Sequence, residues 1–242
     1  MRPFRLALIG LLAVLLCVPH GAANAQVSPS KSVFQIIVME YENQGPYRSA
    51  YHSVSSGTAF FISPDGTALT NSHAVYEVRA HRSTDQLLAI VGNEFFGAKL
   101  VCASALPKGP AKAQSRGAYV GRDVAEIRVT PARFDFDQLT YRDIPYARAH
   151  TGPLQAFPAL SLGPDPAVGD AVRILGFGHL ADSPLPYEWS AKGTVGKTRV
   201  TSDKTPVFEI AFTRDTEPGH SGSPVLNPQD QVVGLFTWQS LR

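Results

Sequence analysis

The feature that most constrains this chain is how its apolar residues are divided. They fall into short runs, and each run is bounded by Gly, Pro, Asp or Ser. Such runs are typical of β-strands, and the long 3.6-residue periodicity of amphipathic helices is absent. We therefore predict an all-β protein. The clearest runs are residues 32–39, 58–62, 87–91, 99–103, 125–129, 172–176, 207–212 and 232–238.

The runs are arranged in two halves. A hairpin turn is predicted at residues 63–66 (SPDG), because Pro presets the turn and Gly accepts a positive φ. A less distinct domain boundary lies at residues 147–157, where ARAHTGPLQAF links two β-rich regions. Many short strands in two halves favour paired antiparallel barrels. We place the first at residues 26–150 and the second at residues 151–242.

Residues 1–25 have the three parts of a secretory signal peptide. Arg2 and Arg5 form a basic start, residues 6–18 are apolar, and Ala23-Asn24-Ala25 is a cleavage site. The apolar run is short for a bilayer span, and an uncleaved anchor is the alternative. We expect cleavage after Ala25, a secreted or periplasmic protein, and no membrane span once the signal is removed.

Charge and cysteine content restrict the partners. Removing Arg2 and Arg5 from the 22 basic residues leaves 20, against 20 acidic residues. A balanced charge gives no reason to expect nucleic acid as a partner. Cys102 is the only cysteine after residue 25, so no internal disulfide is expected. Residues 107–122 carry four basic and no acidic residues, which predicts a solvated loop or, alternatively, a docking site for an acidic partner.

The most informative stretch is PGHSGSP at residues 218–224, which holds Ser221 between two glycines. A serine hydroxyl is a weak nucleophile that needs a base, an orienting acid and donors for the developing oxyanion. Gly219 has no side chain to block its N–H, so the N–H groups of Gly219 and Ser221 can converge on one point. A tight turn without a catalytic role is the alternative. A lipase-like elbow is disfavoured, because no histidine follows Ser221.

His73 is the best candidate for the base. It follows a predicted strand, turn and strand, so it should lie on the rim of a barrel rather than in its core. His220 adjoins the serine, but neighbouring residues of an extended turn point apart, so we do not assign it as the base. The other histidines after residue 25 lack a comparable setting; they are His52, His81, His150 and His179.

Asp123 is the best candidate for the acid. It opens DVAEIRV, an apolar run of period two, and an aspartate at the mouth of a strand can hold the second imidazole nitrogen. The alternative is a carboxylate that only caps backbone N–H groups. The other aspartates considered lie in turns or polar stretches; they are Asp65, Asp135, Asp137, Asp143 and Asp165.

Five segments together resemble bacterial trypsin-like serine proteases of the chymotrypsin fold, notably the HtrA-type and glutamyl-endopeptidase branches. SGTAFFISPDGTALTNSHAV, DVAEIRV and DTEPGHSGSPVLN are similar to their histidine, aspartate and serine segments. LSLGPDPAVGDAVRILGFG resembles the stretch that opens their second barrel, and VVGLFTW the strand that binds the substrate backbone. The resemblance covers residues 57–238. It implies two antiparallel six-stranded β-barrels, the first carrying the histidine and aspartate and the second the serine.

The resemblance also implies roles for single residues. His73 is the general base, Asp123 orients its ring, and Ser221 attacks the scissile carbonyl. The N–H groups of Gly219 and Ser221 form the oxyanion hole. Thr237 and Trp238 line the substrate groove. An aspartate that serves a zymogen switch in some relatives is replaced here by His220, so no such switch is expected.

Specificity is predicted at Asp215 and Thr216, which correspond to the base of the primary pocket. A carboxylate there implies a modest preference for Arg or Lys before the cut, unless Asp215 faces elsewhere. Glutamate specificity is less favoured, because Phe236 stands where those relatives carry a histidine. Relatives continue beyond the position of Arg242 with a strand that walls the pocket. We leave open whether the second barrel is truncated at its C-terminus.

Two functions follow from the sequence. One is a serine endopeptidase that uses an acyl-enzyme, no cofactor and no metal, and acts on a protein or peptide substrate. The other is an inactive binding module of the same fold, although such proteins usually lose one of the three residues and this chain has all three. Nothing in the sequence indicates an oligomeric state.

Overall fold

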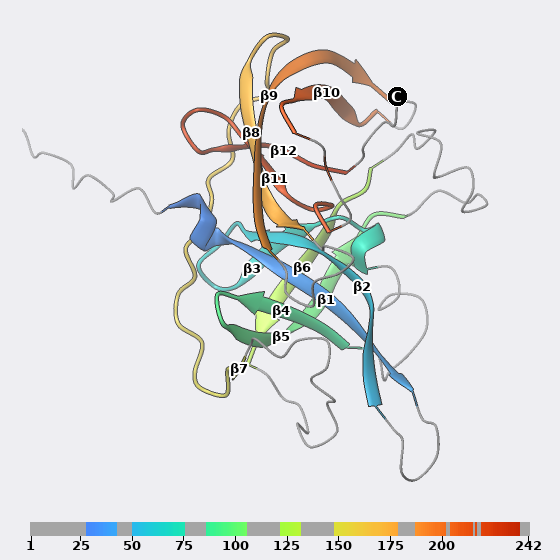
Figure 1. The fold of residues 1–242 in the computed structure, drawn as a ribbon, viewed down its shortest axis with the longest axis vertical. Helices are drawn as coiled ribbons and strands as arrows, with labels where there is room; N and C mark the ends of the chain where they lie inside the picture. The colour runs from blue at the N-terminus through green and yellow to red at the C-terminus, as the bar shows by residue number, and fades with distance from the viewer. Residues whose placement is uncertain are drawn as a thin grey trace, which may run out of the picture.

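The regular structure of the described residues is almost all β-strand, as the sequence predicts. The computed structural model describes residues 28–42, 50–75, 86–105, 122–131, 148–178, 187–201, 204–214, 216 and 219–237. Within them, the helical elements are two short 3₁₀ turns, η1 (Pro29–Ser32) and η2 (His73–Val75). The strands form two sheets, drawn in cool and warm colours in Figure 1.

The first sheet closes into a barrel. Its strand order is β4-β1-β2-β3-β6-β5, and a pairing between β4 and β5 joins the two ends. The short β7 (Arg148–Ala149) adds a parallel pairing on β5. The barrel strands are β1 (Val33–Glu42), β2 (Ala50–Phe61), β3 (Thr67–Thr70), β4 (Gln86–Val91), β5 (Glu94–Ala103) and β6 (Ala125–Thr130).

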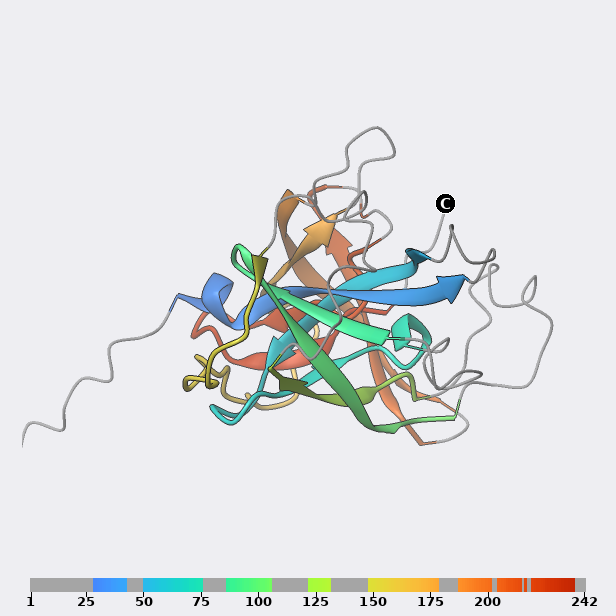
Figure 2. The same ribbon diagram turned by 90° about the horizontal axis from the view of Figure 1, so that it is seen from below.

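The second sheet is open within the described residues and lies beside the first barrel, above it in Figure 1 and behind it in Figure 2. Its order is β10-β9-β8-β11-β12, all antiparallel. The fold class is therefore confirmed as two antiparallel β-barrels of the chymotrypsin type, the second with five strands in this part of the chain. These strands are β8 (Ala171–Gly178), β9 (Tyr187–Val200), β10 (Pro206–Phe212), β11 (Pro224–Leu226) and β12 (Val232–Leu235).

All eight runs predicted as strands overlap strands of the structure, but the longest strand of the second sheet, β9, was missed. It spans YEWSAKGTVGKTRV, where polar and small residues alternate with few apolar ones. Its last five residues are exposed, so this part of the strand has no apolar face that would give a periodic signal. The predicted signal peptide lies outside the described residues, and so does the predicted basic loop at residues 107–122 apart from Arg122.

The predicted hairpin turn at residues 63–66 is confirmed. Gly66 has φ +88°, and the N–H of Ile62 binds the carbonyl of Thr67 at 2.9 Å. Asp65 accepts hydrogen bonds from the Thr67 N–H (3.0 Å) and hydroxyl (2.7 Å). These bonds, with Ser63 and the nearby Arg128 guanidinium, lower the pKa of Asp65 to about 2.

Three apolar clusters explain how the sheets are held together. One fills the first barrel around Phe34, Phe61 and Ile127, and a second lies on the second sheet around Ile174 and Trp189. The third lies between the sheets and draws residues from both. Its buried members are Val33, Phe60, Leu160, Leu175, Leu226 and Val232. Among the described residues, no helix is long and apolar enough to cross a membrane.

Candidate active site

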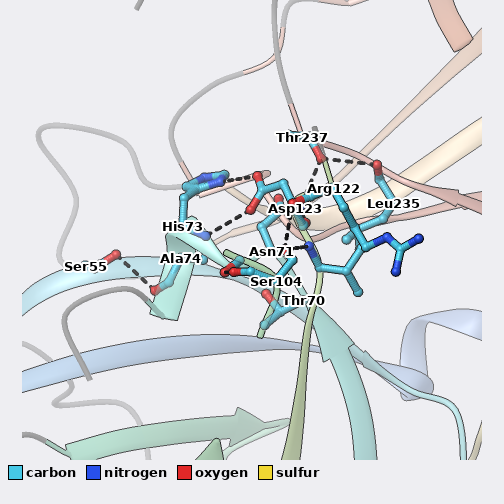
Figure 3. A network of polar contacts seen from close by, with 12 residues as sticks. Ser55, Thr70, Asn71, His73, Ala74, Ser104, Arg122, Asp123, Leu235 and Thr237 are labelled. Atoms are coloured by element: carbon cyan, nitrogen blue, oxygen red, sulfur yellow. Dashed lines mark hydrogen bonds and ion pairs between the residues drawn. The ribbon is translucent and has the colours of Figure 1, made fainter. Parts of the chain in front are cut away.

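His73 and Asp123 meet because their strands are paired. In the register of β3 and β6, Thr70 lies opposite Ala125, so the end of β3 and the start of β6 share one edge of the barrel. His73 follows Thr70 by three residues, and Asp123 precedes Ala125 by two. The turn η2 at His73 then directs the ring toward Asp123 (Figure 3).

Two contacts join this pair. The Nδ1 atom of His73 lies 2.6 Å from Oδ2 of Asp123, and the His73 backbone N–H donates to Oδ1 at 3.0 Å. The Asp123 side chain is only 3% exposed, whereas that of His73 is 37% exposed. The carboxylate is therefore buried behind a ring that still faces solvent. An Asp bound to Nδ1 selects the tautomer in which Nε2 carries the lone pair that can accept a proton.

Neighbouring side chains hold the aspartate loop in place. Asn71 donates to the Asp123 carbonyl and to the Thr237 hydroxyl, both at 2.9 Å. Ser72 donates to the Ser104 carbonyl at 2.7 Å, and Ser104 in turn donates to the Arg122 carbonyl at 2.6 Å. Figure 3 shows this network around His73 and Asp123. Sequence reasoning did not assign Asn71 or Ser104, although the small polar residues before His73 were a signal that could have found Asn71.

Ser221 lies in a loop of the second half that docks on the first barrel. The Ser221 carbonyl accepts the N–H of Thr58 in β2 at 2.8 Å. A Cβ atom added to Gly57 would lie 3.2 Å from the Ser221 carbonyl oxygen and 3.1 Å from the Cβ of Ala74. Gly57 is thus enclosed between Ser221 and the residue after His73. The structure brings all three residues of the predicted triad to one end of the first barrel.

Two glycines of the serine loop have conformations that other residues rarely adopt. Gly219 has φ +97° and Gly222 has φ +88°. A Cβ on Gly222 would lie 2.0 Å from the Thr58 carbonyl oxygen, so only glycine fits there. Within the part of the chain that the structure describes, no backbone carbonyl accepts the N–H groups of Gly219 and Ser221. These are the donors predicted for an oxyanion hole.

The structure describes only two of the four predicted substrate-binding residues. Thr237 lies 2.9 Å from Asn71, on the His73 side of the site. Thr216 is buried. Asp215 and Trp238 lie outside the described residues.

The other histidines that the structure describes have different surroundings. His220 is fully buried, and its ring stacks on Trp189 with centroids 4.0 Å apart. His150 stacks on Phe96 and contacts Glu94, at the far side of the first barrel. Of the described histidine rings, His73 is the one in contact with Asp123.

Comparison with known families decides the relationship. The family model of the trypsin-like peptidase domain matches residues 57–235, which is most of the chain. This chain belongs to that family. The match begins at Gly57 beside the serine loop and ends at Leu235 in β12, so it includes His73, Asp123 and Ser221. A search of curated proteins returned no match.

Membership in the trypsin-like peptidase family agrees with the two-barrel architecture and with the order of the site residues along the chain. It makes the chain a trypsin-like serine protease, so peptides are its substrate class.

Proposed function

We propose that this protein is a serine endopeptidase that hydrolyses peptide bonds through Ser221, His73 and Asp123. The observation that carries the proposal is the pair beside the Ser221 loop. The buried Asp123 carboxylate has its Oδ2 atom 2.6 Å from Nδ1 of His73, whose imidazole is partly exposed. An aspartate, a histidine and a serine in this arrangement supply the orienting acid, the base and the nucleophile of acyl transfer.

In the proposed mechanism, His73 Nε2 takes the proton of the Ser221 hydroxyl while the oxygen attacks the scissile carbonyl. The N–H groups of Gly219 and Ser221 bind the oxyanion of the tetrahedral intermediate. His73 then gives its proton to the leaving amine, which departs and leaves an acyl-enzyme. Water then attacks the ester while His73 takes its proton. His73 returns that proton to the Ser221 oxygen, and the second product leaves with a new carboxylate.

The test is covalent labelling by a fluorophosphonate probe, which reacts with an activated serine. Wild-type protein should be labelled, Ser221→Ala should not, and Ser161→Ala, a substitution of an exposed serine in the segment between the sheets, should react like wild type. A folded wild-type protein that resists the probe would support the inactive binding module instead. Labelling that survives Ser221→Ala would show that another residue is the nucleophile.

We propose a modest preference for Arg or Lys before the cut, set by Asp215. The support is the position of Asp215, six residues before Ser221, together with the pairing of carboxylates with guanidinium and ammonium groups. Matched substrates with Arg, Glu, Phe and Val at that site should be compared in wild type and Asp215→Ser. Equal rates on all four would remove Asp215 from the pocket.

We also propose that the protein is exported and acts outside the cytoplasm, after cleavage behind Ala25. The support is the signal-peptide pattern of residues 1–25. N-terminal sequencing of the protein recovered from its native compartment should begin at Gln26. Recovery with residues 1–25 intact would support the uncleaved anchor.

A further inference from the structure

Thr58 of β2 uses every hydrogen-bonding group it has, and two of its bonds go to the serine loop. Its hydroxyl donates to the Gly219 carbonyl at 2.9 Å, and its N–H donates to the Ser221 carbonyl at 2.8 Å. The same hydroxyl accepts the N–H of Phe177 in β8 at 3.0 Å. The Thr58 carbonyl accepts the Thr70 hydroxyl at 2.7 Å. Thr58 therefore joins the first barrel, the second sheet and the serine loop.

The surroundings of Thr58 are dry and tight. The residue is fully buried, and two glycines, Gly176 and Gly222, bring backbone against it. A Cβ on Gly222 would lie 2.0 Å from the Thr58 carbonyl oxygen, and one on Gly176 would lie 3.1 Å from its hydroxyl. The tight packing leaves little room for a water molecule to replace the hydroxyl, which needs space and polar partners. Loss of the hydroxyl would leave the Gly219 carbonyl and the Phe177 N–H without this partner.

The two carbonyls that Thr58 binds belong to Gly219 and Ser221, whose N–H groups form the proposed oxyanion hole. Gly219, at φ +97°, has more backbone freedom than residues with a side chain, because no side chain restricts its rotation. A hydrogen bond to its carbonyl fixes the peptide plane between Gly219 and His220. The bond to the Ser221 carbonyl fixes the loop on the other side of that plane. Donors for an oxyanion are effective only when they are already oriented before charge develops.

We propose that Thr58 is a positioning residue for the oxyanion hole, acting through its hydroxyl on Gly219. This inference rests on the proposed function, since it concerns the same reaction. Thr58 does not touch the substrate and exchanges no proton with it. Its contribution should therefore appear in the rate of the chemical step and not in substrate binding.

The experiment compares four variants of the full chain. Thr58→Val removes the hydroxyl and keeps the shape, Thr58→Ser keeps the hydroxyl, and Thr58→Cys replaces it with a weak donor of similar size. Thr67→Val is the matched control, because it removes another buried threonine hydroxyl of the first barrel, which donates to Asp65 in the hairpin turn at 2.7 Å and not to the serine loop. For each, the rate constant of fluorophosphonate labelling is measured, and kcat and KM are measured on one peptide substrate. Thermal unfolding sets a temperature at which every variant is folded.

We expect Thr58→Val to lower kcat and the labelling rate about 10- to 100-fold with KM nearly unchanged, less than the loss of a whole oxyanion donor. Thr58→Ser should stay within about threefold of wild type, Thr58→Cys should fall between, and Thr67→Val should change kcat less than about threefold. If Thr58→Val does not fold, the Cys and Ser variants provide the same contrast.

Three results would overturn the inference while leaving the proposed function intact. They are equal loss of kcat in the Val and Ser variants of Thr58, an equal loss in Thr67→Val, and a folded Thr58→Val that labels like wild type. A wild-type protein that neither labels nor cleaves would overturn the proposed function and this inference together. The wild-type rate thus tests the first proposal, and the ratio between variants tests the second.

Discussion

The two halves of the site are held in different ways. His73 and Asp123 both come from the first barrel, and direct contacts of the Asp123 carboxylate with the His73 ring and backbone join them. Ser221 comes from the second half, yet the carbonyls of its loop are bound by Thr58 of the first barrel. The first barrel therefore anchors both halves. The geometry of the site should depend more on that barrel than on the sheet that supplies the serine.

The apolar core of the first barrel is also more deeply buried and more closely packed than that of the second sheet. In the first barrel, Phe61 is fully buried and stacks on Phe34 and Phe157, with ring centroids 4.4 and 4.3 Å away. In the second sheet, Phe212 is only partly buried and meets Phe236 edge-on at 5.8 Å. A closed barrel with stacked rings is a firmer support than an open sheet with a partly exposed face.

The largest expected effect is a loss of kcat when the contact between Asp123 and His73 is broken. Asp123→Asn should lower kcat about 10⁴-fold and leave the fold intact, because an amide facing Nδ1 favours the wrong imidazole tautomer. Steady-state hydrolysis of one peptide substrate measures it. Asp170→Asn is the control, since Asp170 accepts the Ala167 N–H at 2.8 Å in the second half. A loss below tenfold in Asp123→Asn would contradict the role given to this contact.

The docking of the serine loop is tested by Gly222→Ala. The new Cβ would clash with the Thr58 carbonyl and occupy a left-handed conformation, so we expect destabilisation above about 4 kcal/mol or failure to fold. Gly169→Ala is the control. Gly169 has φ +94° but open space around it, so only the conformational cost of about 1–2 kcal/mol remains. Denaturant unfolding that gives equal losses would mean that the loop is not held tightly on β2.

The difference between the cores is tested by two truncations of the same residue type. Phe61→Ala should cost about 3–5 kcal/mol, because it leaves a cavity between stacked rings. Phe212→Ala should cost about 1–2 kcal/mol, because a partly exposed ring loses less burial. Denaturant unfolding of both variants gives the comparison. If Phe212→Ala were the more damaging, the second half would be the better packed of the two.

The smallest effect is expected at the hairpin turn of the first barrel. Hydrogen bonds from Thr67 stabilise the ionised Asp65 carboxylate, whose folded-state pKa of about 2 lies below its ordinary value of 3.8. Its contribution is therefore fully present above that ordinary value and is lost as the pH falls toward 2. Asp65→Asn should lower the melting temperature slightly at neutral pH, and the difference from wild type should shrink between pH 5 and pH 2. A constant difference across this range would exclude the charge as the cause.

The sequence predicts the architecture well where local rules are strong. Short apolar runs between Gly, Pro, Asp and Ser located most strands, and the SPDG turn was predicted with its positive φ at Gly66. The candidates His73, Asp123 and Ser221 emerged from strand ends and small residues, and the structure brings their segments together. The sequence could not reveal Thr58, because its importance comes from contacts with Gly219 and Phe177 across the molecule. It also missed β9, whose exposed half carries no apolar pattern.

The span of the contacts around the serine loop has a consequence for the order of folding. Thr58 and Gly219 are 161 positions apart, and Asn71 and Thr237 are 166 apart. Contacts between such distant positions close long loops of chain, so they are costly in entropy and form slowly. The pair His73 and Asp123 belongs to the first barrel alone, so it does not need the serine loop in order to form. Under the proposed mechanism, a chain whose serine loop has not yet docked would lack its nucleophile and be inert, which would protect its own unfolded copies from digestion.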